Sequence, residues 1–151
     1  MLRLSTKGRY GTRLMLNLAR YYGDGQRTVI LKDVSEEEEI SIRYLEQIII
    51  PLKINRLVKS VRGAGGGYML ARRPEEITLA EILHALEGTC CLVECIEDEG
   101  FCDRIGTCPT FDIWKGASEL LKNYFTGITL ANVVTIADRK KKKPRARPKT
   151  R

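Results

Sequence analysis

The order of elements in the first half of the chain constrains the fold most, because two short helices and a tight turn lead directly into a glycine-rich hairpin. Leu31–Glu38 has helical periodicity with an acidic end expected to face solvent, and Ile40–Ser41 is the turn. Ser41 can then cap a second helix. Leu57–Val61 alternates like a strand, and Gly67–Leu70 returns as its partner. This order is typical of a winged helix-turn-helix domain.

The rest of the chain is predicted to be helical apart from an aperiodic loop over Cys90–Pro109. Pro51 should kink or end the helix that begins at Ser41. The other predicted elements are a helix over Arg3–Tyr22 capped by Ser5 or Thr6, a short strand over Thr28–Ile30, a helix opened by the capping box of Thr78 and Glu81 and running to Leu86, and helices over Asp112–Phe125 and Thr129–Ala137. The expected fold is mainly α with a small β-hairpin. Its parts are a winged helix-turn-helix domain over residues 1–73, a cysteine loop with helices over 74–137, and a tail over 138–151.

Charge follows almost the same division. Residues 1–73 hold 14 Lys or Arg against 7 Asp or Glu, residues 74–138 hold 3 against 12, and residues 139–151 hold 9 against none. Because a basic module attracts phosphate and an acidic one is repelled by it, the first part is the better candidate for contact with nucleic acid. The tail has two prolines and no apolar residue beyond Ala146, so we expect it to be disordered. Its basic charge either adds non-specific attraction to DNA or only solubilises the chain.

The number and clustering of the cysteines indicate what kind of chemistry they serve. All five fall between Cys90 and Cys108. The chain has no stretch of 18 apolar residues, and its first residues are basic and polar, so we expect neither a membrane span nor a secretory signal, and a cytoplasmic protein. An odd, clustered set of cysteines in such a chain argues against a disulfide scaffold and points to metal, cluster or thiol chemistry.

The helix that begins at Ser41 is the candidate for reading DNA, because the second helix of such a domain enters the major groove with its N-terminal residues towards base edges. Gln47 suits adenine, Arg43 suits guanine or a phosphate, and Glu46 can accept from the amino group of cytosine. The predicted contacts of this helix are Ser41, Arg43, Tyr44, Glu46, Gln47 and Lys53. The alternative is an ordinary solvated surface, but the basic hairpin that follows favours DNA.

The hairpin carries four glycines over residues 63–67, so its backbone can approach phosphates closely. Arg62, with Gly63 and Gly65, is predicted to contact the minor groove or a phosphate. A nucleotide-binding loop is a weak alternative because no Gly-Lys-Ser/Thr follows, and a merely flexible hairpin is another. Near the start of the first helix, Arg3, Lys7 and Arg9 are predicted to position the protein on phosphates.

Several motifs along the chain match one family when they are taken together. They are Leu4–Tyr10, Tyr44–Gln47, Leu57–Tyr68, Leu86–Gly88, Cys108–Thr110 with Trp114, and Ile128–Ala131. Over about residues 2–137 the sequence resembles the IscR-type winged-helix transcription regulators, whose relatives include NsrR and CymR. Where that family's turn usually has glycine this chain has Arg56, and Asn55 is expected to take the left-handed conformation instead.

The resemblance implies a homodimer that binds double-stranded DNA. The helix over Asp112–Phe125 would be a long dimerisation helix that crosses to the partner, with an interface stripe of Ile113, Ala117, Leu120 and Tyr124, flanked by Trp114 and Leu121. An intramolecular core is the other use of such a stripe, and the two are compatible. Two-fold symmetry then predicts a near-palindromic operator.

The resemblance also implies an iron–sulfur cluster held by Cys95, Cys102 and Cys108, of the 2Fe–2S type more often than 4Fe–4S. The fourth ligand is unknown. The family's histidine position is Phe111 here, and an acidic position used by some relatives is near Arg9, which cannot ligate. The remaining candidates are Cys90, Cys91, Glu94, a small exogenous thiol and, least favoured, the only histidine, His84.

The expected function is a transcription regulator, not an enzyme, that senses redox, iron–sulfur or nitric-oxide status through this loop. One alternative keeps the DNA-binding fold but makes the loop a zinc site or a thiol–disulfide switch. A remote alternative is a thiol redox enzyme using Cys90 and Cys91 or Cys95. It is disfavoured because no histidine base follows and no Cys-x-x-Cys pair is present.

Overall fold

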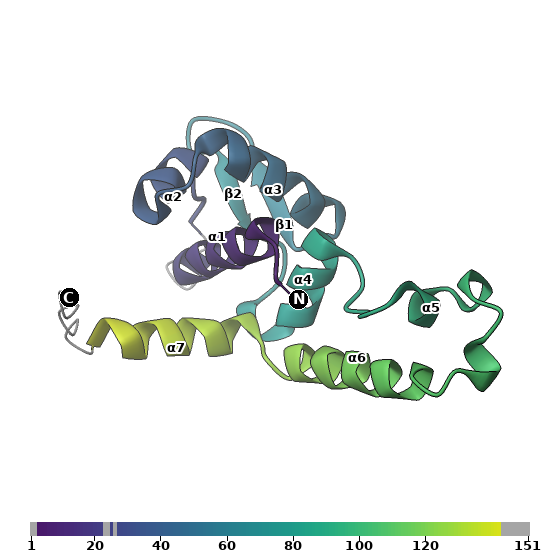
Figure 1. Cartoon of the computed structure of the whole chain (residues 1–151). Coiled ribbons are helices and arrows are strands. Elements are labelled where there is room, and N and C mark those ends of the chain that lie inside the picture. The colour runs from purple at the N-terminus through teal and green to yellow at the C-terminus, as the bar shows by residue number, and fades with distance from the viewer. Residues whose placement is uncertain (1–2, 23–24, 26, 143–151) are drawn as a thin grey trace, which may run out of the picture.

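The computed structural model describes residues 3–22, 25 and 27–142 and consists of a helical head carrying a β-hairpin, with an arm that reaches away from it (Figure 1). The helices are α1 (Thr6–Tyr22), α2 (Leu31–Glu38), α3 (Ile42–Ile54), α4 (Leu79–Glu87), α5 (Glu94–Glu97), α6 (Phe111–Thr126) and α7 (Leu130–Lys142). Strands β1 (Val58–Val61) and β2 (Gly67–Leu70) form the hairpin, and short 3-10 helices cover Pro74–Glu76, Glu99–Phe101 and Ile105–Thr107. The order helix, turn, helix, hairpin is the predicted one.

One hydrophobic core joins α1 to α4. Leu14 of α1 and Leu45 of α3 are fully buried in it, and so are Ile82 of α4 and Leu130 of α7. The core therefore runs across residue 73, so the first two predicted parts of the chain are packed together instead of having separate interiors. Among the described residues, no helix is long and apolar enough to cross a membrane.

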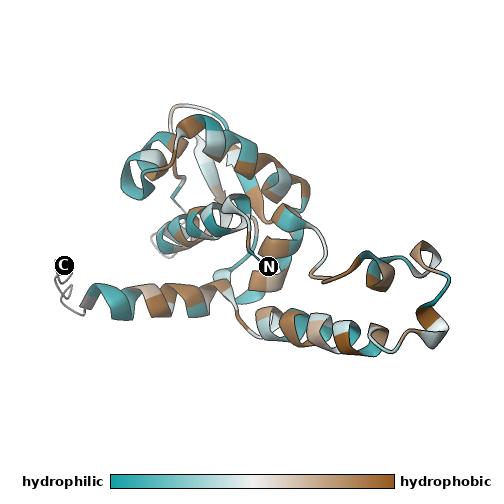
Figure 2. Cartoon of the chain, in the orientation of Figure 1, coloured by the Kyte–Doolittle hydropathy of each residue, from teal (hydrophilic) through white to brown (hydrophobic). Residues whose placement is uncertain are grey.

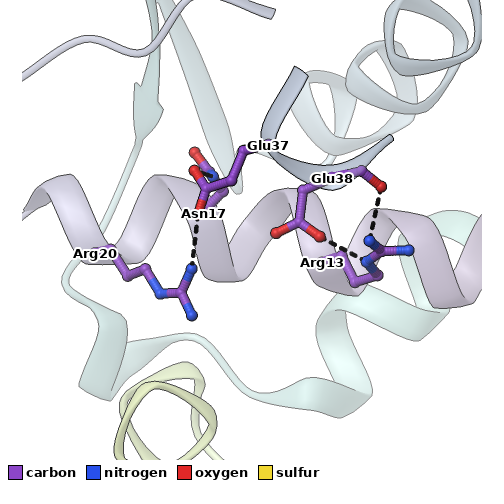
Figure 3. Close-up of polar contacts among 5 residues, drawn as sticks. All are labelled: Arg13, Asn17, Arg20, Glu37 and Glu38. Atoms are coloured by element: carbon purple, nitrogen blue, oxygen red, sulfur yellow. Dashed lines mark hydrogen bonds and ion pairs between the residues drawn. The ribbon is translucent and has the colours of Figure 1, made fainter. Parts of the chain in front are cut away.

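A polar clamp fixes α2 against α1 (Figure 3). The Arg13 guanidinium donates to the carboxylate and to the backbone carbonyl of Glu38, both at 2.7 Å. Glu37 accepts from the buried amide of Asn17 at 2.7 Å and from Arg20 at 3.2 Å. The prediction that the acidic end of α2 faces solvent is confirmed for Glu36 and Glu37, which are exposed, and is wrong for Glu38, whose side chain is only 13% exposed because it pairs with Arg13.

The end of α3 corrects two predictions. The helix runs through Pro51, which only removes the N–H that would have bonded to the carbonyl of residue 47. Arg56, not Asn55, takes the left-handed conformation, with φ of 55°. The Arg56 and Leu57 amides then donate to the carbonyls of residues 53 and 52, which is the Schellman ending that requires this conformation one residue after the cap. Asn55 stays at φ of −81° and its side chain donates to the Pro51 carbonyl.

A backbone bridge joins the hairpin to the segment before α2. Val58 pairs with Leu70 and Val61 with Gly67 in an antiparallel register. The predicted strand over residues 28–30 is reduced to a single bridge, in which Val29 and Tyr68 exchange two backbone hydrogen bonds of 2.8 Å.

Replacing Gly67 with alanine is expected to destabilise the head by about 2–3 kcal/mol. Gly67 has φ of 155°, and a Cβ there would lie 2.7 Å from the Val29 carbonyl oxygen, so the bridging backbone would have to move. Thermal or urea unfolding measures the loss. Gly65→Ala is the matched control, because a Cβ there has no neighbour within 4 Å. Equal stability of the two variants would contradict this account.

The arm consists of the cysteine loop and α6, and α7 then turns back to pack on α1 (Figure 1). The predicted loop over residues 90–109 contains α5 and two 3-10 helices, each too short to show a period. Helix α7 extends through Lys142, beyond the predicted end at Ala137, so residues 138–142 are helical and not disordered. The rest of the predicted disordered tail, from residue 143 on, lies outside the described residues.

Candidate nucleic-acid interface and cysteine loop

The N-terminal half of α3 presents polar side chains on the face opposite its buried residues. Ser41 caps the helix by accepting from the Tyr44 amide at 3.3 Å. Arg43, Glu46 and Gln47 are exposed, whereas Leu45, Ile48 and Leu52 on the other face are buried. The three predicted base-reading side chains thus share one open surface, with guanidinium, carboxylate and amide groups available to a ligand.

Two of the other predicted contacts on α3 are engaged with the head. The half-buried Tyr44 ring packs edge-on against Tyr10 of α1, with ring centroids 5.9 Å apart. The Lys53 ammonium lies 5.9 Å from the centre of the Tyr68 ring on β2. These contacts hold α3 between α1 and the hairpin, and they leave part of each side chain at the surface.

The tip of the hairpin is a hydrogen-bonded turn that is exposed to solvent. The Gly66 amide donates to the Gly63 carbonyl at 2.9 Å, and Gly63 has φ of 110°, which favours glycine. The Gly65 carbonyl accepts from the Thr28 hydroxyl at 2.6 Å, which ties the tip to the segment before α2. Arg62 is exposed at the end of β1. The wing therefore projects a guanidinium beside a backbone that lacks side chains.

The start of α1 is capped from a distant part of the chain. Ser5 accepts from the Gly8 amide at 3.2 Å, so it is one of the two predicted caps, and the helix begins at Thr6, after Arg3. The Glu87 carboxylate of α4 accepts from the same amide at 2.8 Å and from the Ser5 hydroxyl. Sequence reasoning missed Glu87, because its partner lies 79 residues away. Lys7 is half-exposed on the first turn of α1, and the exposed Arg9 donates to Thr6 at 3.3 Å.

All five cysteines are free thiols of intermediate exposure. Within residues 3–22, 25 and 27–142, no three His, Cys, Asp or Glu side chains come together in a way that can hold a metal ion. The structure therefore does not gather Cys95, Cys102 and Cys108 into a preformed site. The Thr110 hydroxyl, 3.3 Å from the Cys108 sulfur, lowers the pKa of that thiol, whereas burial raises the pKa of the Cys90 thiol.

The chemistry of the donor set nevertheless fits a cluster. Cys95, Cys102 and Cys108 lie in one loop of short helical turns, and thiolates are the ligands that iron–sulfur clusters prefer. The exposed His84 of α4 lines a hollow of 740 Å³ between α4 and α6 together with Cys90 and Cys91. Cys90 and Cys91 thus lie at the start of the loop, in a hollow shared with His84 of α4, whereas the three matching cysteines lie further along the loop.

Helix α6 lacks a partner along its apolar stripe. Leu120 and Tyr124 are 72% and 65% exposed, and Ile113 and Trp114 are exposed as well. Only Ser118 of α6 is fully buried; its hydroxyl accepts from the Leu92 amide at 3.0 Å and so ties the loop to the helix. Hydrophobic residues recur along the length of α6 in Figure 2. The intramolecular core does not use this stripe.

A capped helix with an open polar face, followed by a basic glycine wing, defines the class of winged helix-turn-helix DNA-binding proteins. A family model described as Rrf2, an iron-dependent transcriptional regulator, matches residues 4–136. The chain belongs to this Rrf2 family and is a DNA-binding transcription regulator. The resemblance to IscR-type regulators is thereby confirmed.

Relatives and solved structures agree with this assignment. The chain is 36% identical over 137 residues to the regulator CymR of Bacillus subtilis (91% of this chain, 93% of the relative) and 38% identical over 137 residues to IscR of Yersinia pseudotuberculosis (91% and 82%). Its fold is similar to that of T. potens IscR, with a TM-score of 0.76, 35% identity and coverage of 95% and 93%. It is also similar to CymR, the global cysteine regulator of B. subtilis, with a TM-score of 0.73, 35% identity and coverage of 90% and 98%. These proteins are regulators and not enzymes.

Proposed function

We propose that the protein regulates transcription by placing the open face of α3 in the major groove of an operator. Arg43, Glu46 and Gln47 read base edges, and Arg62 of the wing contacts the adjacent minor groove or a phosphate. The single observation that carries this proposal is the exposure of those three polar side chains on one face of a capped helix directly before a basic wing. The remaining predicted contacts, which position the head on phosphates, are Arg3, Lys7, Arg9, Ser41, Tyr44, Lys53, Gly63 and Gly65.

The operator is near-palindromic because the protein acts as a homodimer through α6. An exposed apolar stripe on a long helix is costly in water and marks an interaction surface. The same stripe on a second copy of the chain buries it in a two-fold symmetric interface. This arrangement places two heads on half-sites one or more helical turns apart. The dimer is proposed to act in the cytoplasm, where the operator is.

Cys95, Cys102 and Cys108 are proposed to hold an iron–sulfur cluster, most simply 2Fe–2S, with a fourth ligand from elsewhere. When bound, the cluster supplies redox and nitric-oxide sensitivity and a cross-link between three points of the loop. The loop transmits this change, because the Ser118 hydroxyl ties it to α6. Ordering of the loop then changes the position of α6, the helix that joins the two heads. A coupling of about 1–3 kcal/mol gives a change of roughly 5- to 150-fold in operator affinity.

A second candidate is a zinc or thiol–disulfide switch in the same loop. It is favoured by the partial exposure of the free thiols, which leaves them accessible, and by the similarity to the cysteine regulator CymR. Iron and sulfide counts distinguish the two candidates. Iron with sulfide supports the cluster, and zinc or neither supports the switch.

Replacing Gln47 with alanine is expected to cost about 1–3 kcal/mol of binding to the protein's selected operator, roughly 5- to 150-fold, and almost nothing on unrelated DNA. The reason is that an amide paired with adenine carries specificity, whereas phosphate contacts carry affinity. Fluorescence anisotropy with duplexes selected from a random library measures both affinities.

Arg62→Ala is the comparison variant in that experiment. It is expected to weaken binding to all duplexes alike. It should also lower the salt dependence of the affinity by the contribution of about one phosphate contact. Equal loss on selected and unrelated duplexes for Gln47→Ala would contradict the role given to α3.

A further inference from the structure

The outward ridge of α3 turns apolar towards its C-terminal end. Arg43, Gln47, Ile50 and Ile54 follow one another at helical spacing on the side opposite the buried face. Ile50 is 57% exposed and Ile54 is 74% exposed. Two large apolar side chains therefore stand in water on the same ridge as the polar groups that are proposed to read bases.

The head itself gives these isoleucines no packing role, because the core side of α3 is already filled by Leu45, Ile48 and Leu52. Ile50 lies one turn from Gln47, about 4.5 Å further along the helix axis. That step is close to the spacing of about 3.4 Å between successive bases of a strand. An α3 that places Gln47 against a base thus brings Ile50 against the floor of the same groove.

The charge around the ridge indicates that DNA is the partner that covers Ile50 and Ile54. Lys53, Arg56 and Lys59 are exposed beside it, and they complement a phosphate backbone. Within the major groove the only apolar group on a base edge is the C5-methyl of thymine. A protein partner would also cover isoleucine side chains, but the basic surroundings and the shared ridge favour DNA.

We propose that Ile50 is a specificity-determining residue that reads a thymine C5-methyl group beside the base contacted by Gln47. Ile54 covers the outer side of this contact and excludes water from it. The inference rests on the proposed function, because it takes α3 to lie in the major groove. It deepens that function by specifying a thymine in each half-site.

The test compares thymine with uracil, which keeps the pairing and the O4 acceptor but lacks the methyl group. A duplex is selected from a random library with the full-length protein and resynthesised with uracil at one thymine position at a time. Wild-type protein is expected to lose roughly fourfold in affinity at one position of a half-site, the effect of burying one methyl-sized group. Ile50→Ala is expected to bind the thymine and uracil duplexes equally, both at the weakened level.

Ile136→Ala is the matched control, because Ile136 is a similarly exposed isoleucine on α7. It should keep the wild-type difference between thymine and uracil. Indifference of the wild type to uracil at every position, or an unchanged difference between thymine and uracil in Ile50→Ala, overturns the inference while leaving DNA binding intact. Wild-type affinity of Ile50→Ala for the selected duplex overturns it as well, because Ile50 would then not contact the DNA. Failure of the wild type to select any duplex contradicts the proposed function itself, and the inference with it.

Discussion

Leu120→Asp is expected to leave the protein monomeric and to weaken its binding to a two-half-site operator by about 100-fold or more. Leu120 is the most exposed member of the α6 stripe, and an aspartate there would place two carboxylates in a shared apolar interface. Each head would then bind its half-site alone, without the gain from tethering. Light scattering reports the oligomeric state, and anisotropy on whole operators and half-sites reports the binding.

Asn123→Asp serves as the control for charge on α6, because Asn123 is exposed and lies off the apolar stripe. It is expected to stay dimeric with unchanged operator affinity. Binding of Leu120→Asp to a single half-site should also match the wild type, since its head is intact. A dimeric Leu120→Asp would show that the two copies meet elsewhere.

Cys102→Ala is expected to abolish the visible absorbance of anaerobically purified protein and to reduce bound iron and sulfide to background. Cys102 is the middle of the three proposed ligands, so the loop would keep only two of the thiolates that hold the cluster. Operator affinity of the variant should equal that of wild-type protein stripped of its cluster.

Thr107→Ala is the matched control, because Thr107 is exposed in the same loop and is not one of the candidate ligands. It is expected to retain the absorbance. Zinc in place of iron in the wild type would favour the second candidate for the loop. Equal operator affinity of the wild type with and without its cluster would contradict the proposed switch.

The features that sequence reasoning predicted well depend on local signals. Ser41 caps α3, and Thr78 and Glu81 form a capping box, because both patterns act over three residues. The bounds of α2 and of the hairpin followed from periodicity and from glycine positions. The fold class was therefore predictable without any knowledge of tertiary contacts.

The errors arose where contacts between distant segments, or the exact geometry of a helix end, decide the outcome. Glu38 turns inward because Arg13 of α1, 25 residues away in sequence, donates to both its carboxylate and its backbone carbonyl. Arg56 takes the left-handed position because the Leu57 amide must reach the carbonyl of residue 52, a requirement that outweighs the greater tolerance of asparagine for that conformation. The resemblance implies that three cysteines hold one cluster, but a match in sequence does not place their sulfur atoms in space.

Methylation interference at guanine N7 on a selected duplex, with the cluster-loaded and the cluster-free dimer, tests the placement of α3 most directly. N7 lies on the major-groove edge of guanine, which Arg43 is proposed to contact. We predict interference at two symmetric positions about one helical turn, or a multiple of it, apart. Failure of both forms to bind double-stranded DNA, even in dilute salt, would contradict the account.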